Sequence, residues 1–385
     1  MMTLAYVFAV VVLTVALVGG HQLFWRWYYT RPWCPDERHF VQTSDGWRIA
    51  LARLRPTASG PARGEPVVCF PGLACNGRIF DFDAEHSLGR HLADLGFDVW
   101  IVDPRGTGAS ERAGFFGRGF GYGFRAYADH DAPAAVQHVL GVTGHTQVLW
   151  VGHSMGGLVG YELSLHHRLG DHLAGVVALG SPADFSPHRE LLGPLHTFVL
   201  DRFLRGWPVV RLGRLCNLLA PLAGWVRTWP ETLFVFAPNT PPRMLRHFMV
   251  EVVEDVPRQL LDEFADNVVR AIGFDGRPAR DGQAALAASA VPVLAIAGSH
   301  DRVAPPPSVV AAVHLVGCED ATECVVGHDE GMGFGHLDLV VGAAAPRVIY
   351  PRVAEWLLAR RSTRSRSSAE APAARADASA ASTPG

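Results

Sequence analysis

Short apolar runs alternate with helix-like stretches along most of the chain. Between residues 40 and 54 (FVQTSDGWRIALARL), two alternating segments flank Ser44-Asp45-Gly46, which predicts an antiparallel hairpin. Continuous apolar runs predict buried strands at 66–70, 98–103, 147–152, 173–179 and 291–297. Helical spacing predicts helices at 87–95, 126–140, 155–166 and 346–361. Because strands alternate with helices, we predict an α/β fold with a mostly parallel sheet covered by helices on both faces.

The alternation stops between residues 185 and 288. Helical spacing persists there in HTFVLDRFLRGW (196–207) and PRQLLDEFADNVVRAI (257–272), which predicts a helical cap inserted over the sheet. Residues after 361 lack aromatic and large apolar side chains, so a disordered tail is expected. The predicted organisation is a first core part at 40–184, a cap at 185–288, a second core part at 289–361 and a tail at 362–385.

The N-terminus carries an uncharged apolar run at 4–18, and residues 1–20 just reach the length of a membrane-spanning helix. A cleaved secretory signal, and hence a secreted protein, is the alternative. No Lys or Arg precedes the run and no A-x-A site follows it, which favours an uncleaved single-pass anchor. The segment 21–39 resembles a membrane-interface belt, with aromatic residues at Trp25, Trp27, Tyr28, Tyr29 and Trp33. Arg26 and Arg31 follow the span and slightly favour a cytoplasmic location for the rest of the chain.

Composition narrows the possible functions. Of 385 residues, 49% are hydrophobic, which is ample for a core, and 34 basic against 37 acidic residues give a net charge of −3. This balance argues against a nucleic-acid partner. The six cysteines show no zinc spacing, and although Cys318 and Cys324 could close a small loop in an oxidising compartment, we expect ordinary buried thiols. No phosphate-binding motif or ligand cluster predicts a cofactor or a metal.

Residues 152–157 (GHSMGG) match G-x-S-x-G between a predicted strand and a predicted helix. This context is that of a nucleophile elbow, in which a tight turn exposes the serine above the sheet and small neighbours avoid clashes. A glycine-rich structural turn is the alternative explanation. We predict Ser154 as a nucleophile.

A serine hydroxyl needs an adjacent base, and in this arrangement the chain order is serine, acid, histidine. Asp301 follows the strand at 291–297 and is the predicted acid, with Asp184 as the reserve candidate. His336, in the glycine-rich GMGFGHLDLVVG, is the predicted base and is preferred over the nearby His328. Asp301 can alternatively be a turn or helix-capping residue, and 18 histidines make a chance match possible.

An oxyanion hole requires two backbone N–H donors directed at the developing negative charge. The amide of Met155, directly after the nucleophile, is the first predicted donor. The second is the amide of Leu73, which follows Pro71-Gly72 at the end of the strand at 66–70. Pro71-Gly72 can also be a simple turn.

Taken together, the segments PGLACNGRIFD, VDPRGTGAS, GHSMGG, AGSHDRV and GHLDLVVG resemble the α/β-hydrolase superfamily over about residues 40–360, and within it acid lipases and related esterases. The resemblance implies Ser154, Asp301 and His336 as a catalytic triad, with Leu73 and Met155 as oxyanion donors. Relatives usually carry His-Gly where this chain has Pro71-Gly72, a departure that leaves the backbone donor in place. We interpret Asp103 and Arg105 as structural and expect His153 to line the pocket without a required role.

These residues predict hydrolysis of a hydrophobic carboxylic ester, of the esterase or lipase kind, through an acyl-enzyme. Two alternatives stay open at this point. One is an acyltransferase or polyester-related enzyme, in which an alcohol replaces water. The other is a non-catalytic, membrane-tethered binding protein. An epoxide hydrolase or dehalogenase is disfavoured because those enzymes use Asp at the position of Ser154.

Overall fold

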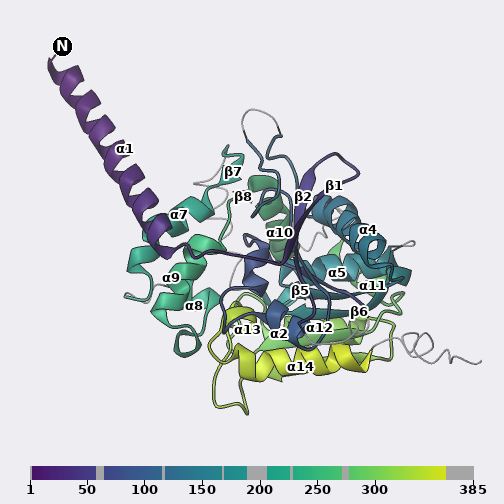
Figure 1. The fold of residues 1–385 in the computed structure, drawn as a ribbon. Coiled ribbons are helices and arrows are strands. Elements are labelled where there is room, and N and C mark those ends of the chain that lie inside the picture. Colours follow the sequence, from purple (N-terminus) through teal and green to yellow (C-terminus); the bar gives the residue numbers. More distant parts are fainter. Residues whose placement is uncertain are drawn as a thin grey trace, which may run out of the picture.

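The central sheet contains eight strands in the order β1-β2-β4-β3-β5-β6-β9-β10 (Figure 1). The computed structural model describes residues 2–57, 65–114, 118–166, 169–188, 206–225, 229–270 and 277–360. The strands from β4 to β10 pair in parallel, and β2 pairs antiparallel with both β1 and β4. The sheet strands are β1 (Glu37–Gln42), β2 (Arg48–Leu54), β3 (Val67–Phe70), β4 (Val99–Asp103), β5 (Val148–His153), β6 (Leu173–Leu179), β9 (Val293–Gly298) and β10 (Ala321–Val326).

Helices cover both faces of this sheet. The main core helices in the described chain are α2 (Leu88–Asp94), α4 (Ala132–Thr143), α5 (Met155–Leu165), α12 (Pro306–Leu315), α13 (Asp338–Val341) and α14 (Ala345–Ala359). Short elements are the 3₁₀ helices η1 (Gly77–Phe80), η3 (Gly170–His172) and η4 (Ser186–His188), and the run α3 (Phe124–Ala126) and π-helical η2 (Tyr127–Asp131) before α4. The predicted α/β class with a mostly parallel sheet is confirmed.

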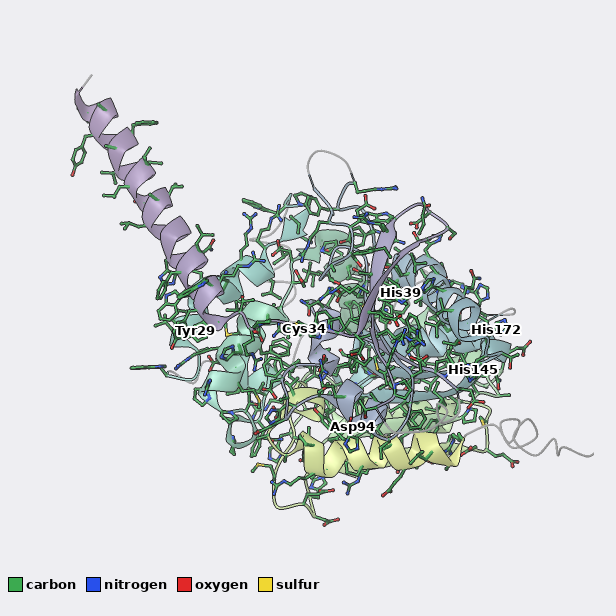
Figure 2. The ribbon with its side chains drawn as sticks, in the orientation of Figure 1. Tyr29, Cys34, His39, Asp94, His145 and His172 are labelled. Carbon is green, nitrogen blue, oxygen red and sulfur yellow. The ribbon has the colours of Figure 1, made fainter. Side chains whose placement is uncertain are left out.

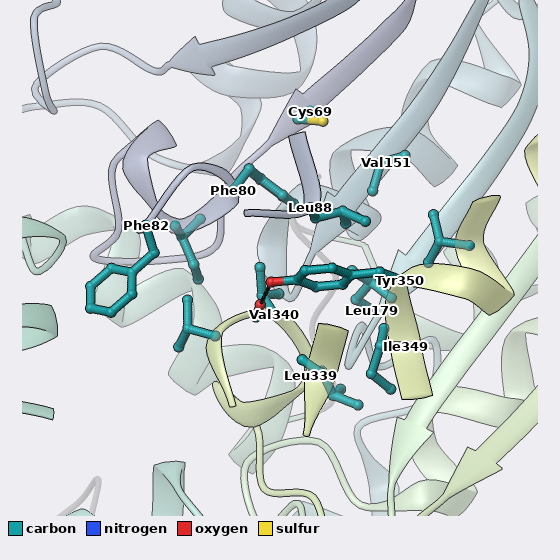
Figure 3. Packing of buried hydrophobic residues seen from close by; sticks show 14 of the residues in the cluster. Cys69, Phe80, Phe82, Leu88, Val151, Leu179, Leu339, Val340, Ile349 and Tyr350 are labelled. Carbon is teal, nitrogen blue, oxygen red and sulfur yellow. Dashed lines mark hydrogen bonds between the residues drawn. The ribbon is translucent and has the colours of Figure 1, made fainter. Parts of the chain in front are cut away.

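Successive residues of each buried strand point to opposite faces and build two separate apolar clusters. On β5, Leu149 and Val151 contribute to the cluster with α2 and α14, whereas Trp150 contributes to the cluster with α4 and α5. Figure 3 shows part of the first cluster, where Tyr350 lies among aliphatic side chains and its hydroxyl donates to the Val340 carbonyl at 2.7 Å. Both faces of the central strands are therefore closed to water, as continuous apolar strands require.

The region between β6 and β9 departs from the alternation, as expected. Its described elements, apart from η4, are α7 (Leu212–Leu219), η5 (Ala220–Leu222), α8 (Trp229–Phe234), η6 (Ala237–Asn239), α9 (Pro242–Glu251), α10 (Arg258–Arg270) and α11 (Ala279–Leu286). A two-stranded sheet of β7 (Val209–Val210) and β8 (Val256–Pro257), which the sequence reading did not foresee, joins two parts of it. The segment 196–205 of the first predicted cap helix and the predicted tail lie outside the described residues.

The N-terminal helix α1 (Met2–Tyr29) projects away from the body and meets it beside α7 and α9 (Figure 1). Its span from Ala5 to Tyr29 is long and apolar enough to cross a membrane, and none of its most apolar window is buried. Near its end, His21 Nε2 lies 3.1 Å from the Leu218 carbonyl of α7. Figure 2 marks Tyr29 and Cys34, which flank the segment that enters the body.

The six cysteines are all free thiols. Cys69 and Cys75 are buried, as expected of ordinary core thiols, and burial raises the pKa of Cys75 to about 12. The expectation of buried thiols is wrong for Cys34, which is exposed, and Cys318 and Cys324 do not form the disulfide that was considered. Cys34 is exposed because it lies in the extended segment between α1 and β1 rather than in the core.

Candidate active site

Ser154 lies in the turn between β5 and α5 with a strained backbone. Its φ is 53° and ψ is −118°, and among the described residues only Ala74 is another non-glycine with positive φ. L-residues disfavour this conformation, which persists only where the surroundings enforce it. The Ser154 amide donates to the Leu179 carbonyl at 2.8 Å, which fixes the turn against β6. This is the geometry of a nucleophile elbow.

The glycines around Ser154 are required by close backbone contacts. A Cβ on Gly152 would lie 2.3 Å from the backbone of Gly156, and a Cβ on Gly156 would lie 2.0 Å from the Phe70 carbonyl oxygen. Neither neighbour can retreat, since both are backbone atoms, one in strand β3 and the other in helix α5. The sequence expectation of small residues at 152 and 156 therefore has a direct steric cause.

His336 and Asp301 meet in the interior. Asp301 follows strand β9, and His336 precedes helix α13. His336 Nδ1 lies 2.8 Å from Asp301 Oδ2, and their side chains are 4% and 0% exposed. The other carboxylate oxygen of Asp301 accepts the amides of Val303 and Ala304 at 2.9 and 2.7 Å. Because Asp301 fixes Nδ1 as the donor, Nε2 of His336 is free to act as the base.

Within the described chain no hydrogen bond joins Ser154 Oγ to the His336 imidazole, but the segments next to Ser154 lie against that ring. His153, adjacent in sequence to Ser154, has its ring centroid 4.8 Å from that of His336. A Cβ on Gly180, next to the Leu179 carbonyl that binds Ser154, would lie 3.2 Å from both His336 Nδ1 and Asp301 Oδ2. Such contacts are often long without substrate and shorten when it binds.

The loop after β3 packs directly against the elbow. A Cβ on Gly72 would lie 2.9 Å from Ser154 Cβ and 3.2 Å from the His153 carbonyl oxygen. Only glycine permits this approach, which brings the following Leu73 next to Ser154. Met155 is the first residue of α5, where an amide has no acceptor inside its own helix. The two predicted oxyanion donors thus belong to adjoining segments.

His153 does not line the pocket, contrary to our expectation. It is 1% exposed, and its Nε2 donates to the His336 carbonyl at 3.1 Å. Burial, together with the charge of nearby His336, lowers the pKa of His153 to about 3, so the ring is neutral at physiological pH. Its Nδ1 has no hydrogen-bond partner in the described structure. His153 supports the loop that carries His336, a role that spacing alone does not reveal.

Asp338 is a second residue whose role the sequence did not disclose. Its Oδ2 accepts the amides of Gly335 and Phe236 at 2.7 and 2.6 Å, and its Oδ1 accepts the Thr240 hydroxyl. Burial raises the pKa of Asp338 to about 6 despite these hydrogen bonds. The carboxylate therefore ties the His336 loop to the segment around η6.

The reserve candidates lie elsewhere. Asp184 Oδ1 accepts the Ser186 amide and hydroxyl and the Gln283 side-chain amide, and His328 is exposed. Asp103 accepts the amides of Gly77 and Ala109, in line with the structural role expected for it.

Arg105 likewise takes a structural part. It forms a buried ion pair with Asp131 and a partly exposed one with Asp45, and so orders the loop after β4. Among the described residues, no three His, Cys, Asp or Glu side chains are grouped so that they could hold a metal.

A small hollow lies beside the oxyanion loop. It is lined by Gly72, Ala74, Met155 and Leu260, among others, so it places Met155 and the neighbours of Leu73 opposite α10. A larger pocket, lined by Phe124, Tyr161 and Gln283 among others, contains none of the five predicted site residues. Of these two hollows, the first contacts the elbow, through Met155.

Relatives with the same sequence features include two lipases. The chain is 33% identical over 213 residues to lysosomal acid lipase/cholesteryl ester hydrolase of Macaca fascicularis, covering 52% of this chain and 49% of that protein. It is 29% identical over 185 residues to triacylglycerol lipase 2 of Arabidopsis thaliana, covering 45% and 44%. The matched part thus spans about half the length of these relatives.

Solved structures show the same fold at low sequence identity. A monoacylglycerol lipase of Paleococcus ferrophilus superposes with a TM-score of 0.54 and 18% identity, covering 81% of this chain and 99% of that one. The sequence profile of the alpha/beta hydrolase fold matches residues 65–334, which include the elbow, Asp301 and the oxyanion loop. On this match and the sheet topology, the chain belongs to the alpha/beta hydrolase fold family.

Proposed function

We propose that the protein is a serine hydrolase that cleaves a hydrophobic carboxylic ester through an acyl-enzyme on Ser154. The observation that carries the proposal is the buried 2.8 Å contact between His336 and Asp301 beside a strained serine elbow. Burying an acid–imidazole pair costs desolvation free energy, and the fold alone does not need such a pair. Beside the serine turn, the pair has a clear chemical use. The lipase names of the relatives support the ester as substrate class.

The reaction follows from these positions. His336 Nε2 takes the Ser154 proton while Oγ forms a bond to the ester carbonyl carbon. The amides of Leu73 and Met155 hold the oxyanion, and Asp301 stabilises the imidazolium. The carbonyl reforms as the alkoxide leaves with the proton from His336. Water, deprotonated by His336, then attacks the acyl carbon, and Ser154 regains its proton when the acid departs.

Replacement of Ser154 by Ala tests this assignment. Ser154→Ala should lower kcat for p-nitrophenyl esters by about 10⁶-fold, because loss of the nucleophile removes the covalent path. Ser186→Ala is the matched control, since Ser186 is exposed and its hydroxyl donates to the loop residue Asp184; its kcat should be unchanged. Turnover by Ser154→Ala at the wild-type rate, with the same circular dichroism spectrum, would reject the proposal.

We also propose that α1 anchors the protein in a membrane, which gives it access to lipid esters. The helix is unburied and apolar, and the neighbouring α7–η5 surface exposes Leu215, Leu219 and Leu222 by 49, 43 and 63%. Exposed apolar side chains beside the end of an apolar helix favour a lipid environment for the helix and for the α7–η5 surface. Of the two arginines after the span, Arg26 is exposed, whereas Arg31 is paired inside the body, so a cytoplasmic body draws support from Arg26 alone.

Alkaline extraction of membranes containing the full chain tests the anchor. The protein should stay in the membrane pellet, and its intact mass should include residues 1–29. A soluble protein whose mature mass lacks this segment would identify a cleaved secretory signal instead.

A further inference from the structure

Arg31, two residues after α1, is bound by a carboxylate of the cap. Its backbone amide donates to Glu251 Oε1 at 2.5 Å, and its guanidinium NH2 lies 2.6 Å from Glu251 Oε2. A second guanidinium NH group contacts Asp83 at 3.1 Å. Arg31, which we expected to flank the membrane span, is thus a partly buried ion-pair partner of two carboxylates.

Glu251, the last residue of α9, is the centre of this cluster. Its side chain is 0% exposed and also lies 3.0 Å from Arg78 NH2, while Arg78 NH1 donates to the Arg31 carbonyl at 2.8 Å. Burial opposes ionisation of Glu251, but hydrogen bonds from His247 and Arg31 and the charge of Arg78 leave its pKa below the ordinary value. The carboxylate is therefore charged, and its position depends on both arginines.

The chain immediately after Glu251 forms the outer edge of the oxyanion loop. The Asn76 side-chain amide donates to the Glu251 carbonyl at 2.9 Å, and the Asn76 backbone amide donates to the Val252 carbonyl at 3.1 Å. Cys75 forms an isolated antiparallel bridge with Val253, and the Glu254 amide donates to the Ala74 carbonyl at 2.8 Å.

Residues 74–76 directly follow Leu73, whose amide is a proposed oxyanion donor. Ala74 has a φ of 60°, which an alanine adopts only when its surroundings force it. Hydrogen bonds between residues 74–76 and residues 251–254 hold this conformation. A change at Glu251 would thus be transmitted to Leu73 through the backbone contacts between residues 251–254 and residues 74–76.

We propose that Arg31 and Glu251 are positioning residues that set the oxyanion loop, so that the segment entering from α1 controls catalytic competence. The inference rests on the proposed ester hydrolysis. Arg31 fixes Glu251, Glu251 fixes the end of α9 and residues 252–254, and these residues fix Ala74 to Asn76. Neither Arg31 nor Glu251 touches the substrate in this scheme.

The test measures the full chain in detergent with a soluble p-nitrophenyl ester and with an alkyl trifluoromethyl ketone, which forms a tetrahedral oxyanion on Ser154. Arg31→Ala should lower kcat about tenfold with little change in KM, since a displaced donor loses part of the roughly 10²–10³-fold effect of its removal. Affinity for the ketone should fall by the same factor. Arg31→Lys keeps the charge but not the two-pronged geometry, and should lose about threefold.

Arg90→Ala is the matched control. Arg90 also pairs with a buried carboxylate, Asp81, and donates to the Cys34 carbonyl of the same N-terminal segment, but it does not contact Glu251. Its kcat and ketone affinity should stay at the wild-type level. If Arg31→Ala does not fold, Arg31→Lys alone decides, by its kcat and its ketone affinity.

Wild-type kcat and ketone affinity in Arg31→Ala, or in a folded Arg31→Lys if Arg31→Ala is unfolded, would overturn the inference. An equal loss in Arg90→Ala would overturn it too, because the effect would then be general destabilisation. Failure of the proposed function is separable, since it would appear as ester turnover that survives Ser154→Ala.

Discussion

The parallel sheet and the cap differ in how their residues are held in place. In the sheet, strands such as β5 are buried along their whole length, and apolar packing on both faces fixes the positions of the attached loops. In the cap, α7 has no fully buried residue, whereas α9 buries Leu245 and Phe248 in the core and also places the paired carboxylate of Glu251 at its end. The difference indicates that apolar packing alone fixes the sheet, whereas the cap is held by apolar packing through α9 together with charge pairing.

Loss of the proposed base should have the largest effect on kcat. This base belongs to the core with the sheet and not to the cap. His336→Ala should lower kcat for a soluble ester by about 10⁶-fold, because Ser154 then has no proton acceptor. His328→Ala, which removes an exposed histidine from the same end of the chain, should retain full activity. Steady-state kinetics on both variants measures the contrast, and comparable activities would refute it.

A Leu→Ala substitution should lower the free energy of unfolding more in the sheet than in the cap. Leu149→Ala, at a residue with 0% exposure on β5, should lower the free energy of unfolding by about 2–5 kcal/mol through lost burial and a cavity. Leu219→Ala, at a 43% exposed site on α7, should change it by less than about 0.5 kcal/mol. Urea unfolding in detergent compares the two, and equal losses would show that the cap face is packed.

A methyl group at Gly72 should test whether the position of the oxyanion loop controls kcat. Gly72→Ala should lower kcat about 100-fold, because its Cβ would lie 2.9 Å from Ser154 Cβ and must displace the loop that carries the Leu73 donor. The control is Gly141→Ala in α4, where a Cβ meets nothing within 4 Å. Wild-type kcat in Gly72→Ala would contradict the tight approach of loop and elbow.

The smallest effect concerns acid stability through His153. Its folded-state pKa of about 3 lies below the ordinary value near 6.5, so the unfolded chain binds more protons in that interval. Stability should therefore be lost as pH falls from about 6.5 towards 3, by up to about 1.4 kcal/mol per pH unit.

His153→Gln keeps a donor for the His336 carbonyl but cannot titrate. Its unfolding free energy, compared with wild type at pH 7 and pH 5, should fall less on acidification. Identical slopes for the two proteins would show that His153 is not buried as a neutral ring.

Much of the sheet could be predicted because buried parallel strands are continuous apolar runs. The hairpin of β1 and β2 and the strands β3, β4, β5, β6 and β9 all lie where those runs indicated. Strand β10 was missed because it lies at the sheet edge, where residues such as Thr322 and Glu323 face solvent and break the apolar pattern. Helix α12 was missed because it begins within a run of prolines.

The site was less accessible to sequence reasoning. Motif and chain order indicated Ser154, Asp301 and His336, and the structure brings the last two into contact. The support from His153 and Asp338 could not be foreseen, since it depends on carbonyl and amide groups that carry no sequence signal. The Arg31–Glu251 pair joins residues 220 positions apart, and no local pattern reports such a contact.

The most direct test of the central claim is the site of reaction with a fluorophosphonate. The full chain, labelled in detergent and digested, should carry the phosphonyl mass on the peptide that contains Ser154, and labelling should be lost in His336→Ala. An unlabelled Ser154 in a folded wild-type protein, or an adduct on another residue with ester turnover intact, would contradict the assignment of Ser154 as the nucleophile.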